Sequence, residues 1–238
     1  MSYFRSRSNK TIIDSMDIVL SKNEEDYLKA LFQITVESNM GVAGTNQLAL
    51  NLGVSPASVN GMIKKLRSKK LVKSERYGKL EMTSQGKTIA IQLVRKHRLW
   101  ETFLYQHLDF SWDEVHEVAE QLEHIKSDKL IKQLNLFLGN PDSDPHGDPI
   151  PDEIGNFSKK SKKNLAQIEE GKSCTVVSVK DASVAFLQMV SKLGIGLQTE
   201  IRVKNHHEFD ASRTLLIGEQ EHQVSLKFAE NVFVKERV

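Results

Sequence analysis

The sequence predicts an α+β protein, mainly α, in which a winged helix-turn-helix is followed by a helical region and a small β-barrel. Two observations predict this order. Apolar residues recur at helical spacing over much of residues 22–139, and from about residue 173 they alternate as in strands. Four of the five prolines lie between these regions, at residues 141–151, and predict a turn-rich connector.

We expect five segments along the 238 residues. They are an N-terminal extension (1–21), a winged helix-turn-helix domain (22–86), a helical domain (87–140), a linker (141–165) and a β-domain (166–238). No apolar run is long enough to span a bilayer, and no secretory signal precedes the first helix. We therefore expect a cytoplasmic protein without a membrane partner, and a core role for Cys174, the single cysteine.

The first helix is predicted over residues 22–38, where apolar side chains recur at helical spacing. The next helix, TNQLALNL, ends before a turn at Gly53, and a third helix is entered at Ser55 and Pro56. Two short β-compatible runs then flank a turn that contains Gly78. Helix, turn, helix and hairpin in this order predict a winged helix-turn-helix.

Charge is segregated along the chain. Residues 55–80 hold eight basic residues and one acidic residue, whereas residues 109–154 hold twelve acidic residues and three lysines. Segregation of this kind indicates one region for a polyanion and another for cations.

The basic region indicates DNA binding, because it follows the helix-turn-helix and continues into the hairpin. A Lys-rich helix end is otherwise a solvated face. We expect helix 56–69 to lie in the major groove, with Asn60 as the best base-reading residue because an amide pairs with adenine through two bonds. The expected DNA contacts are Ser55, Ala57, Ser58 and Asn60 near base edges and Lys64, Lys65, Arg67, Arg76 and Lys79 at phosphates.

The stretch VHEVAEQLEHIKSD (115–128) has an unusual polar face. At about 100° per residue, two imidazoles and two carboxylates fall on one side of a helix over residues 113–126. They are His116, Glu120, Glu123 and His124. On the preceding helix (88–108), His97 and Glu101 lie in an apolar stripe, where they need polar partners. The two helices could supply each other's partners.

These side chains, with Asp26 at the start of the first helix, form a candidate metal site. Oxygen and imidazole ligands without a thiolate suit Mn²⁺ or Fe²⁺, although other divalent transition metals would also bind them in vitro. A ferritin-like di-iron site is disfavoured, because Glu120 and His124 are four residues apart instead of three. The alternative is that the face is simply solvated.

After a further helix over residues 127–139, the segment NPDSDPHGDPIPDEIGN forms the connector. Beyond it, five short strand-like runs and one brief helical stretch predict a β-barrel of about seventy residues.

The order of these elements resembles the diphtheria toxin repressor family of iron- and manganese-dependent transcriptional repressors. The motifs that carry the resemblance are VRKHRLWETFL, VHEVAEQLEH followed by SD, and DPHGDPIP, and it extends from about Lys22 to the C-terminus. It implies a DNA-binding domain, a helical domain that binds metal and dimerises, and an SH3-like barrel. By motif position it implies a primary metal site of Asp26, Glu120, Glu123 and His124 and a second site of His97, Glu101 and His116.

The chain departs from the family pattern at two ligand positions, and it also carries extra N-terminal residues. Members with a two-manganese cluster carry a glutamate where this chain has Lys29, which disfavours such a cluster. The barrel ligands of the iron-responsive branch align with alanines, and Asp181 is the nearest substitute. The extra residues before Leu20 include Arg5, Arg7 and Lys10, a candidate arm for DNA.

The resemblance implies a homodimeric, metal-activated repressor that binds double-stranded operator DNA and controls metal-uptake genes. Glu120 favours Mn²⁺ over Fe²⁺, because iron-responsive relatives have a cysteine at this position. Two alternatives come from other classes. A metal-dependent hydrolase would use the same carboxylates but needs a substrate cleft, and a metal-independent winged-helix regulator would merely pack His97 and His116.

Overall fold

The computed structural model describes residues 18–38, 40–74, 79–156, 163–180 and 183–237. The chain divides into two compact units, an N-terminal unit that ends at Thr83 and a C-terminal unit that begins at Ser84. Among the described helices, none combines the length and the apolar character that crossing a membrane requires.

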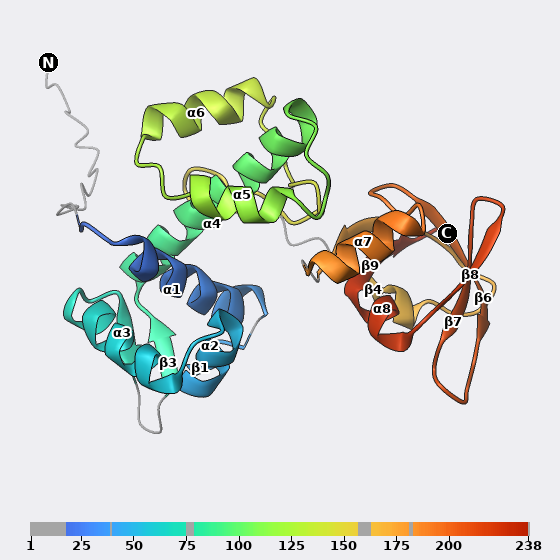
Figure 1. The fold of residues 1–238 in the computed structure, drawn as a ribbon, viewed down its shortest axis with the longest axis horizontal. Coiled ribbons are helices and arrows are strands. Elements are labelled where there is room, and N and C mark those ends of the chain that lie inside the picture. Colours follow the sequence, from blue (N-terminus) through green and yellow to red (C-terminus); the bar gives the residue numbers. More distant parts are fainter. Residues whose placement is uncertain (1–17, 39, 75–78, 157–162, 181–182, 238) are drawn as a thin grey trace, which may run out of the picture. The chain divides into compact units, whose positions relative to one another are not determined.

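The N-terminal unit is a winged helix-turn-helix, as predicted (Figure 1). Its three-stranded antiparallel sheet has the order β1-β3-β2. The first α-helix is shorter than expected, because it ends at Phe32 and the next five residues form a π-helix. The elements are α1 (Lys22–Phe32), the π-helix η1 (Gln33–Glu37), β1 (Ala43–Gly44), α2 (Thr45–Leu52), α3 (Pro56–Ser68), β2 (Val72–Ser74) and β3 (Lys79–Met82).

Local signals define both ends of the turn between α2 and α3. Gly53 has φ +65°, a left-handed conformation that glycine adopts without strain. Ser55 caps α3 by accepting a hydrogen bond from the Ser58 amide, and Pro56 takes the first helical position. The turn residues alone therefore predicted this part of the fold.

The last turn of α3 is tied to α1. Lys69 Nζ lies 2.7 Å from Glu24 Oε1 and donates to the Val19 carbonyl oxygen at 2.9 Å. Glu24 also accepts from the backbone amide of Ser21 in a capping box at the start of α1. Lys69 is thus committed to contacts within the N-terminal unit.

Three helices begin the C-terminal unit, α4 (Ser84–His107), α5 (Val115–Leu122) and α6 (Asp128–Phe137). Their shared core contains Leu99, Leu104, Val115, Ala119 and Ile131. The prediction that residues 113–126 form one helix is wrong after Leu122, because α5 ends there and Ser127 caps α6 by accepting from the Leu130 amide. Glu123 and His124 therefore lie just beyond the helix.

The rest of the C-terminal unit holds one six-stranded antiparallel sheet of order β4-β9-β5-β6-β7-β8, consistent with the SH3-like expectation. The sequence predicts five strands, and the additional strand, β4, has only two residues and a polar sequence. The elements are β4 (Lys163–Asn164), the 3-10 helix η3 (Leu165–Gln167), β5 (Ser173–Val179), α7 (Val184–Lys192), β6 (Glu200–His206), β7 (Arg213–Ile217), β8 (Gln220–Val224), α8 (Leu226–Asn231) and β9 (Val232–Glu236).

Cys174 on β5 is fully buried in the barrel core, as expected. Burial and the nearby Glu236 charge raise the pKa of its thiol to about 11. A thiol in this setting stays protonated and unreactive at neutral pH.

The connector, residues 141–156, packs along α4. Arg98 donates to the Pro149 carbonyl oxygen at 2.8 Å, and Arg95 donates to the Pro151 carbonyl oxygen. Ile150 between the two prolines is buried with the helical core. The proline-rich segment is therefore fixed to the helix that carries His97 and Glu101.

Candidate metal centre

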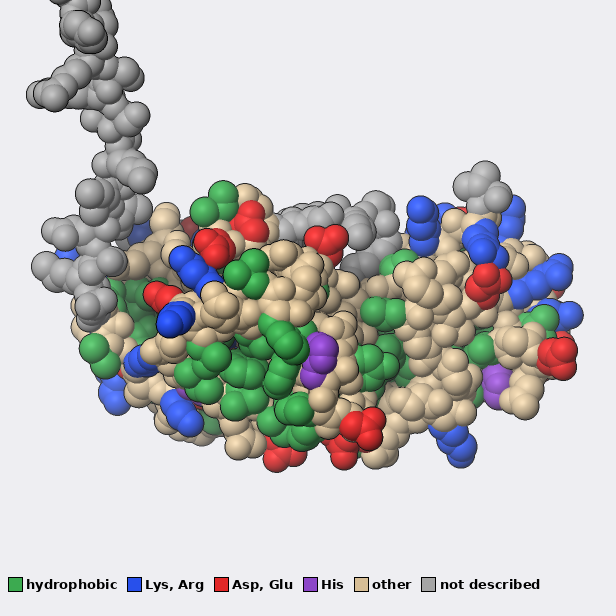
Figure 2. Space-filling view, turned by 90° about the horizontal axis from the view of Figure 1, so that it is seen from above, with side chains coloured by type: hydrophobic (Ala, Val, Ile, Leu, Met, Phe, Trp, Pro, Cys, Tyr) green, Lys and Arg blue, Asp and Glu red, His purple; other side chains and the backbone are tan. Residues whose placement is uncertain are grey.

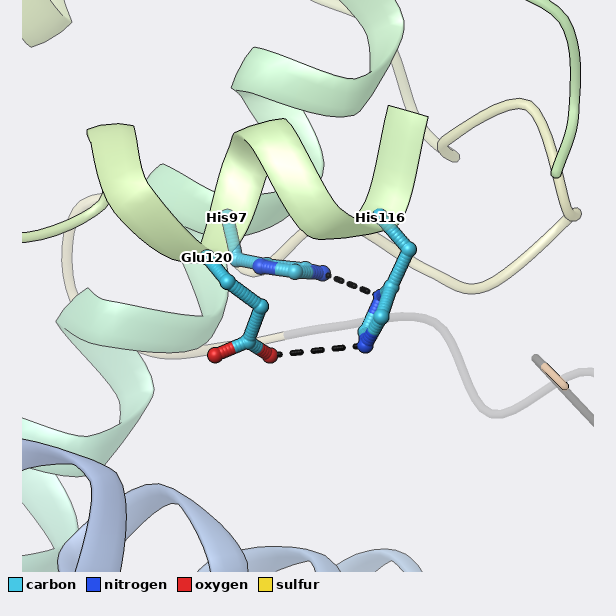
Figure 3. Close-up of side chains that lie close together, drawn as sticks. All are labelled: His97, His116 and Glu120. Atoms are coloured by element: carbon cyan, nitrogen blue, oxygen red, sulfur yellow. Dashed lines mark hydrogen bonds and ion pairs between the residues drawn. The ribbon is translucent and has the colours of Figure 1, made fainter. Parts of the chain in front are cut away.

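Helices α4 and α5 bring one His and one carboxylate each to a shared site. His97 and Glu101 are one turn apart on α4, and His116 and Glu120 are one turn apart on α5. The buried Val115 and Ala119 on the inner side of α5 pack in the helical core and hold it against α4. Figure 3 shows His116 opposite His97 and Glu120, with one of its ring nitrogens directed at each of them.

Three donor atoms of this site form a nearly regular triangle. His97 Nε2 lies 2.9 Å from Glu101 Oε1 and 3.1 Å from His116 Nδ1, and His116 Nδ1 lies 3.1 Å from the same Glu101 oxygen. Adjacent ligands of an octahedral ion with metal–ligand distances of about 2.1 Å are about 3.0 Å apart. The triangle therefore fits one face of an octahedron around a divalent metal ion.

Glu123 fixes the orientation of the His97 ring. Its carboxylate is fully buried, and Oε2 lies 2.6 Å from His97 Nδ1. When Nδ1–H donates to this carboxylate, the lone pair of Nε2 in a neutral ring faces Glu101 Oε1, and that contact is repulsive unless a proton or a cation lies between the atoms. The donor set thus suits a bound cation.

The opposite side of Glu123 faces His124, with 3.9 Å between Oε1 and His124 Nε2. Since His97 contacts Glu123 through one nitrogen and Glu101 through the other, it joins the two predicted sets of ligands. His116 and Glu120 are partly exposed, with 38% and 36% of their side-chain surfaces accessible, so an ion can enter from their side.

The buried part of the site is rich in perturbed groups. Burial would raise the pKa of Glu101, but the positive charge on His97 and the nearby His116 and His146 hold that pKa well below its usual range. Burial alone would lower the pKa of His146, but the carboxylates of Glu101 and Asp144 raise this pKa to about 9. Burial and neighbouring carboxylates raise the pKa of Asp144 to about 8. Perturbed pKa values often cluster in this way at functional sites.

Within the C-terminal unit, the structure brings together the described ligands that the sequence predicts. Glu120, assigned to the primary set, lies 3.4 Å from His116 Nε2, a member of the second set. Asp26 lies on α1 in the N-terminal unit, so its assignment as a ligand stays a prediction. Asp181 lies outside the described residues.

Of the predicted DNA-contacting residues, those that the structure describes lie at the N-cap of α3, on α3 itself and on β3. Val59, Ile63 and Leu66 form the buried side of α3. The remaining positions are exposed, and Arg76 lies outside the described residues. The exposed set comprises Ser55, Ala57, Ser58, Asn60, Lys64, Lys65, Arg67 and Lys79.

Two connector residues at the site were given no role by the sequence. Asp144 and His146 are buried and, with Glu101, offer ligand atoms within 4.8 Å of one another. The available signal was the motif DPHGDPIP, which places a histidine between two prolines.

Three family models match successive parts of the chain. The iron dependent repressor N-terminal DNA binding domain matches residues 19–80. The iron dependent repressor metal binding and dimerisation domain matches residues 83–152. A FeoA domain matches residues 163–236.

Individual proteins agree with these matches. A manganese-dependent transcriptional repressor solved in complex with manganese has a TM-score of 0.80 and 32% identity, over 90% of this chain and 100% of that one. The iron-dependent repressor IdeR of Mycobacterium bovis is 31% identical over 127 residues, so the match spans 53% of this chain and 54% of IdeR. A probable metal transport system membrane protein of Chlamydia trachomatis is 47% identical over 70 residues, 29% of this chain but 16% of that protein.

Proposed function

Since this chain belongs to the family of iron-dependent repressors, we propose that it is a metal-activated, DNA-binding transcriptional repressor of metal-uptake genes. The observation that most directly supports a metal-activated repressor is the triangle of donor atoms from His97, Glu101 and His116. A repressor acts where the chromosome is, so we place it in the cytoplasm.

We propose Mn²⁺ as the activating ion, with Fe²⁺ as the alternative. Within the C-terminal unit the ligands would come from His97, Glu101, His116, Glu120, Glu123 and His124. A bound ion supplies the positive charge that the buried carboxylates Glu101 and Glu123 require. The set contains only oxygen and imidazole nitrogen, which suits Mn²⁺, and a structural neighbour is a manganese-dependent repressor bound to manganese.

Activation would work by linkage. A metal that binds the DNA-competent conformation more tightly than the other conformation shifts the population toward the DNA-competent one. The size of the shift is set by the ratio of the two metal affinities. We propose Asp26 as the ligand supplied by the DNA-binding unit, on the basis of its motif position alone. A ligand on α1 would restrain the recognition helix α3 of each subunit, favouring a spacing near one DNA turn, about 34 Å.

The partner in dimerisation would be a second copy of this chain, docked on α6. Figure 2 shows hydrophobic side chains gathered on the face that carries α6. Leu136 and Phe137 are exposed to 59% and 63%, and His107 packs on the Phe137 ring at 4.8 Å. An apolar patch of this kind on a small protein marks an interface.

Replacing Asn60 by Ala is expected to relax sequence preference at one operator position by about 1–3 kcal/mol, because the amide can no longer pair with a base edge. The side chain is exposed on α3, so the fold should not change. Competition binding with single-base operator variants measures the effect. An equal loss of affinity for every operator variant would instead show that Asn60 contacts the DNA backbone and not a base.

The choice of metal is tested through Glu120. We expect Mn²⁺ to activate operator binding at least as fully as Fe²⁺ and better than Zn²⁺ at matched occupancy, and Glu120→Cys to move the response away from Mn²⁺, because a thiolate is a softer ligand. Anaerobic operator titrations of both chains with each ion measure this. A parent chain activated by Fe²⁺ and indifferent to saturating Mn²⁺ would refute the assignment.

A further inference from the structure

The connector contains a rigid turn at Asp144–Asp148, here called the connector turn. Asp144 Oδ1 accepts from the backbone amides of His146 and Asp148, each at 2.9 Å. Backbone bonds from Asp144 N to Asp148 O and from Gly147 N to Asp144 O close the same turn. Asp144 Oδ2 lies 3.5 Å from Arg98 Nε on α4. The turn thus holds its own shape and is fixed to α4.

His146 in this turn touches three parts of the C-terminal unit. Its Nε2 is 3.0 Å from the Trp112 carbonyl oxygen, so this nitrogen donates. Its Nδ1 lies 3.8 Å from Glu101 Oε2, and its backbone carbonyl accepts from the Val179 amide of β5 at 2.9 Å. The indole of Trp112 lies in the barrel core. His146 therefore connects Glu101 to the barrel.

Glu101 divides its two oxygens between the metal triangle and the connector turn. Oε1 faces His97 and His116, whereas Oε2 faces His146. A third metal ion on the His146 side is disfavoured, because Arg98 already places a positive charge beside Asp144. The connector turn therefore contacts Glu101 through the carboxylate oxygen that does not face the metal triangle.

The connector turn also lies close against β5 at Gly147. Gly147 has φ +82°, and a Cβ at this position would lie 2.1 Å from the Val177 carbonyl oxygen. No side chain fits between the turn and the strand. A displacement of β5 would therefore move His146, and the imidazole would no longer hold Glu101 Oε2 in place.

We propose that His146 is a positioning residue for the ligand Glu101 and that the connector turn couples metal binding at the His97–Glu101–His116 site to strand β5 of the barrel. The inference rests on the proposed role of that site. Outer partners orient metal ligands and typically affect affinity by about 10- to 100-fold. Because coupling between sites is reciprocal, metal binding should in turn protect β5.

The first test replaces His146 by Gln in the full chain and titrates it with Co²⁺ alone, followed by visible absorption. His116→Ala identifies the absorption that belongs to the site. We expect His146→Gln to weaken Co²⁺ binding there by about 10- to 100-fold and to change the band shape. His206→Gln is the matched control, because His206 Nε2 also bonds a backbone carbonyl at 3.0 Å, that of Ile168 on η3's C-terminal side.

Two results have different meanings. If His116→Ala leaves Co²⁺ binding unchanged, the proposed metal site itself is wrong. If His116→Ala removes the absorption but His146→Gln binds Co²⁺ with parental affinity and spectrum, the metal site stands and the role of His146 is overturned.

The second test keeps every ligand and every His146 atom and moves only the turn. Gly147→Ala is expected to weaken Co²⁺ binding at the site and to speed amide hydrogen exchange in β5, residues 173–179. Gly139→Ala is the control, because Gly139 also has positive φ, +73°, but has nothing within 4 Å of an added Cβ. Parental Co²⁺ affinity in a Gly147→Ala chain whose β5 exchanges faster would overturn the coupling. Should Gly147→Ala not fold, amide exchange of β5 in the parent and in His146→Gln, each with and without Co²⁺, decides the coupling. Co²⁺ that protects β5 equally in both chains, or in neither, would overturn it.

Discussion

A chain with Glu123 replaced by Gln is expected to lose metal-stimulated operator binding and to remain a folded dimer. The Glu123 carboxylate is fully buried against His97 Nδ1 at 2.6 Å, and its other oxygen faces His124. An amide of the same shape can still accept from His97, so the packing is kept, but the negative charge that attracts the metal is lost. Coupling of metal and DNA binding is typically worth about 1–3 kcal/mol, and we expect this amount to disappear.

Operator binding titrated with Mn²⁺, in parent and variant, measures the effect. Glu117→Gln is the matched control, because Glu117 is an exposed carboxylate on the same helix α5. A Glu123→Gln chain that responds to Mn²⁺ like the parent would show that Glu123 is not a ligand.

Operator affinity is expected to fall by about 10³- to 10⁵-fold between about 50 and 200 mM salt, if the dimer meets about six to ten phosphates. We propose that exposed basic residues of α3 and of strands β2 and β3 make these contacts, and neutralising a phosphate releases the counterions condensed on it. Lys65→Ala should reduce the salt slope by about one for each subunit's contact, and the loss should be similar for every DNA sequence. Affinities measured over a salt series give the slope.

Lys69→Ala is the control for Lys65. Both lysines lie at the C-terminal end of α3, but Lys69 is held by Glu24 and the Val19 carbonyl oxygen. Lys69→Ala should lower the thermal stability of the N-terminal unit. It should leave the salt dependence of operator binding close to that of the parent. Equal slopes for the parent and the Lys65→Ala chain would remove Lys65 from the DNA contacts.

The parts of the fold that were predicted from sequence are those that local residues determine. The turn between α2 and α3 depends on Gly53, Ser55 and Pro56, whose conformational preferences act within a few residues. The end of α5 was missed because apolar spacing continues to Ile125, whereas the Ser127 cap of the next helix decides where the chain turns. The spacing of apolar residues does not show that the cap of the next helix ends α5 earlier.

The candidate site was predictable where both partners lie on adjacent helices. His97 and Glu101 needed polar partners, and the face of α5 offered them. The support from Asp144 and His146 was not predictable, because it depends on the connector folding back along α4 through bonds from Arg95 and Arg98 to backbone carbonyls. Strand β4 was missed for a similar reason, since it forms by backbone pairing to β9 at the far end of the barrel sequence.

The burial of Cys174 has a practical consequence for testing whether metal binding changes the spacing of the proposed recognition helices. It is the single cysteine of the chain, and a thiol whose pKa is raised to about 11 presents little thiolate to a maleimide or methanethiosulfonate probe at neutral pH. A spin label or fluorophore attached to a cysteine introduced at the exposed Ser68 would therefore mark each α3 once, with the native residue left in place. The distance between the two labels of a dimer, with and without Mn²⁺, then reports directly on the spacing that the operator requires.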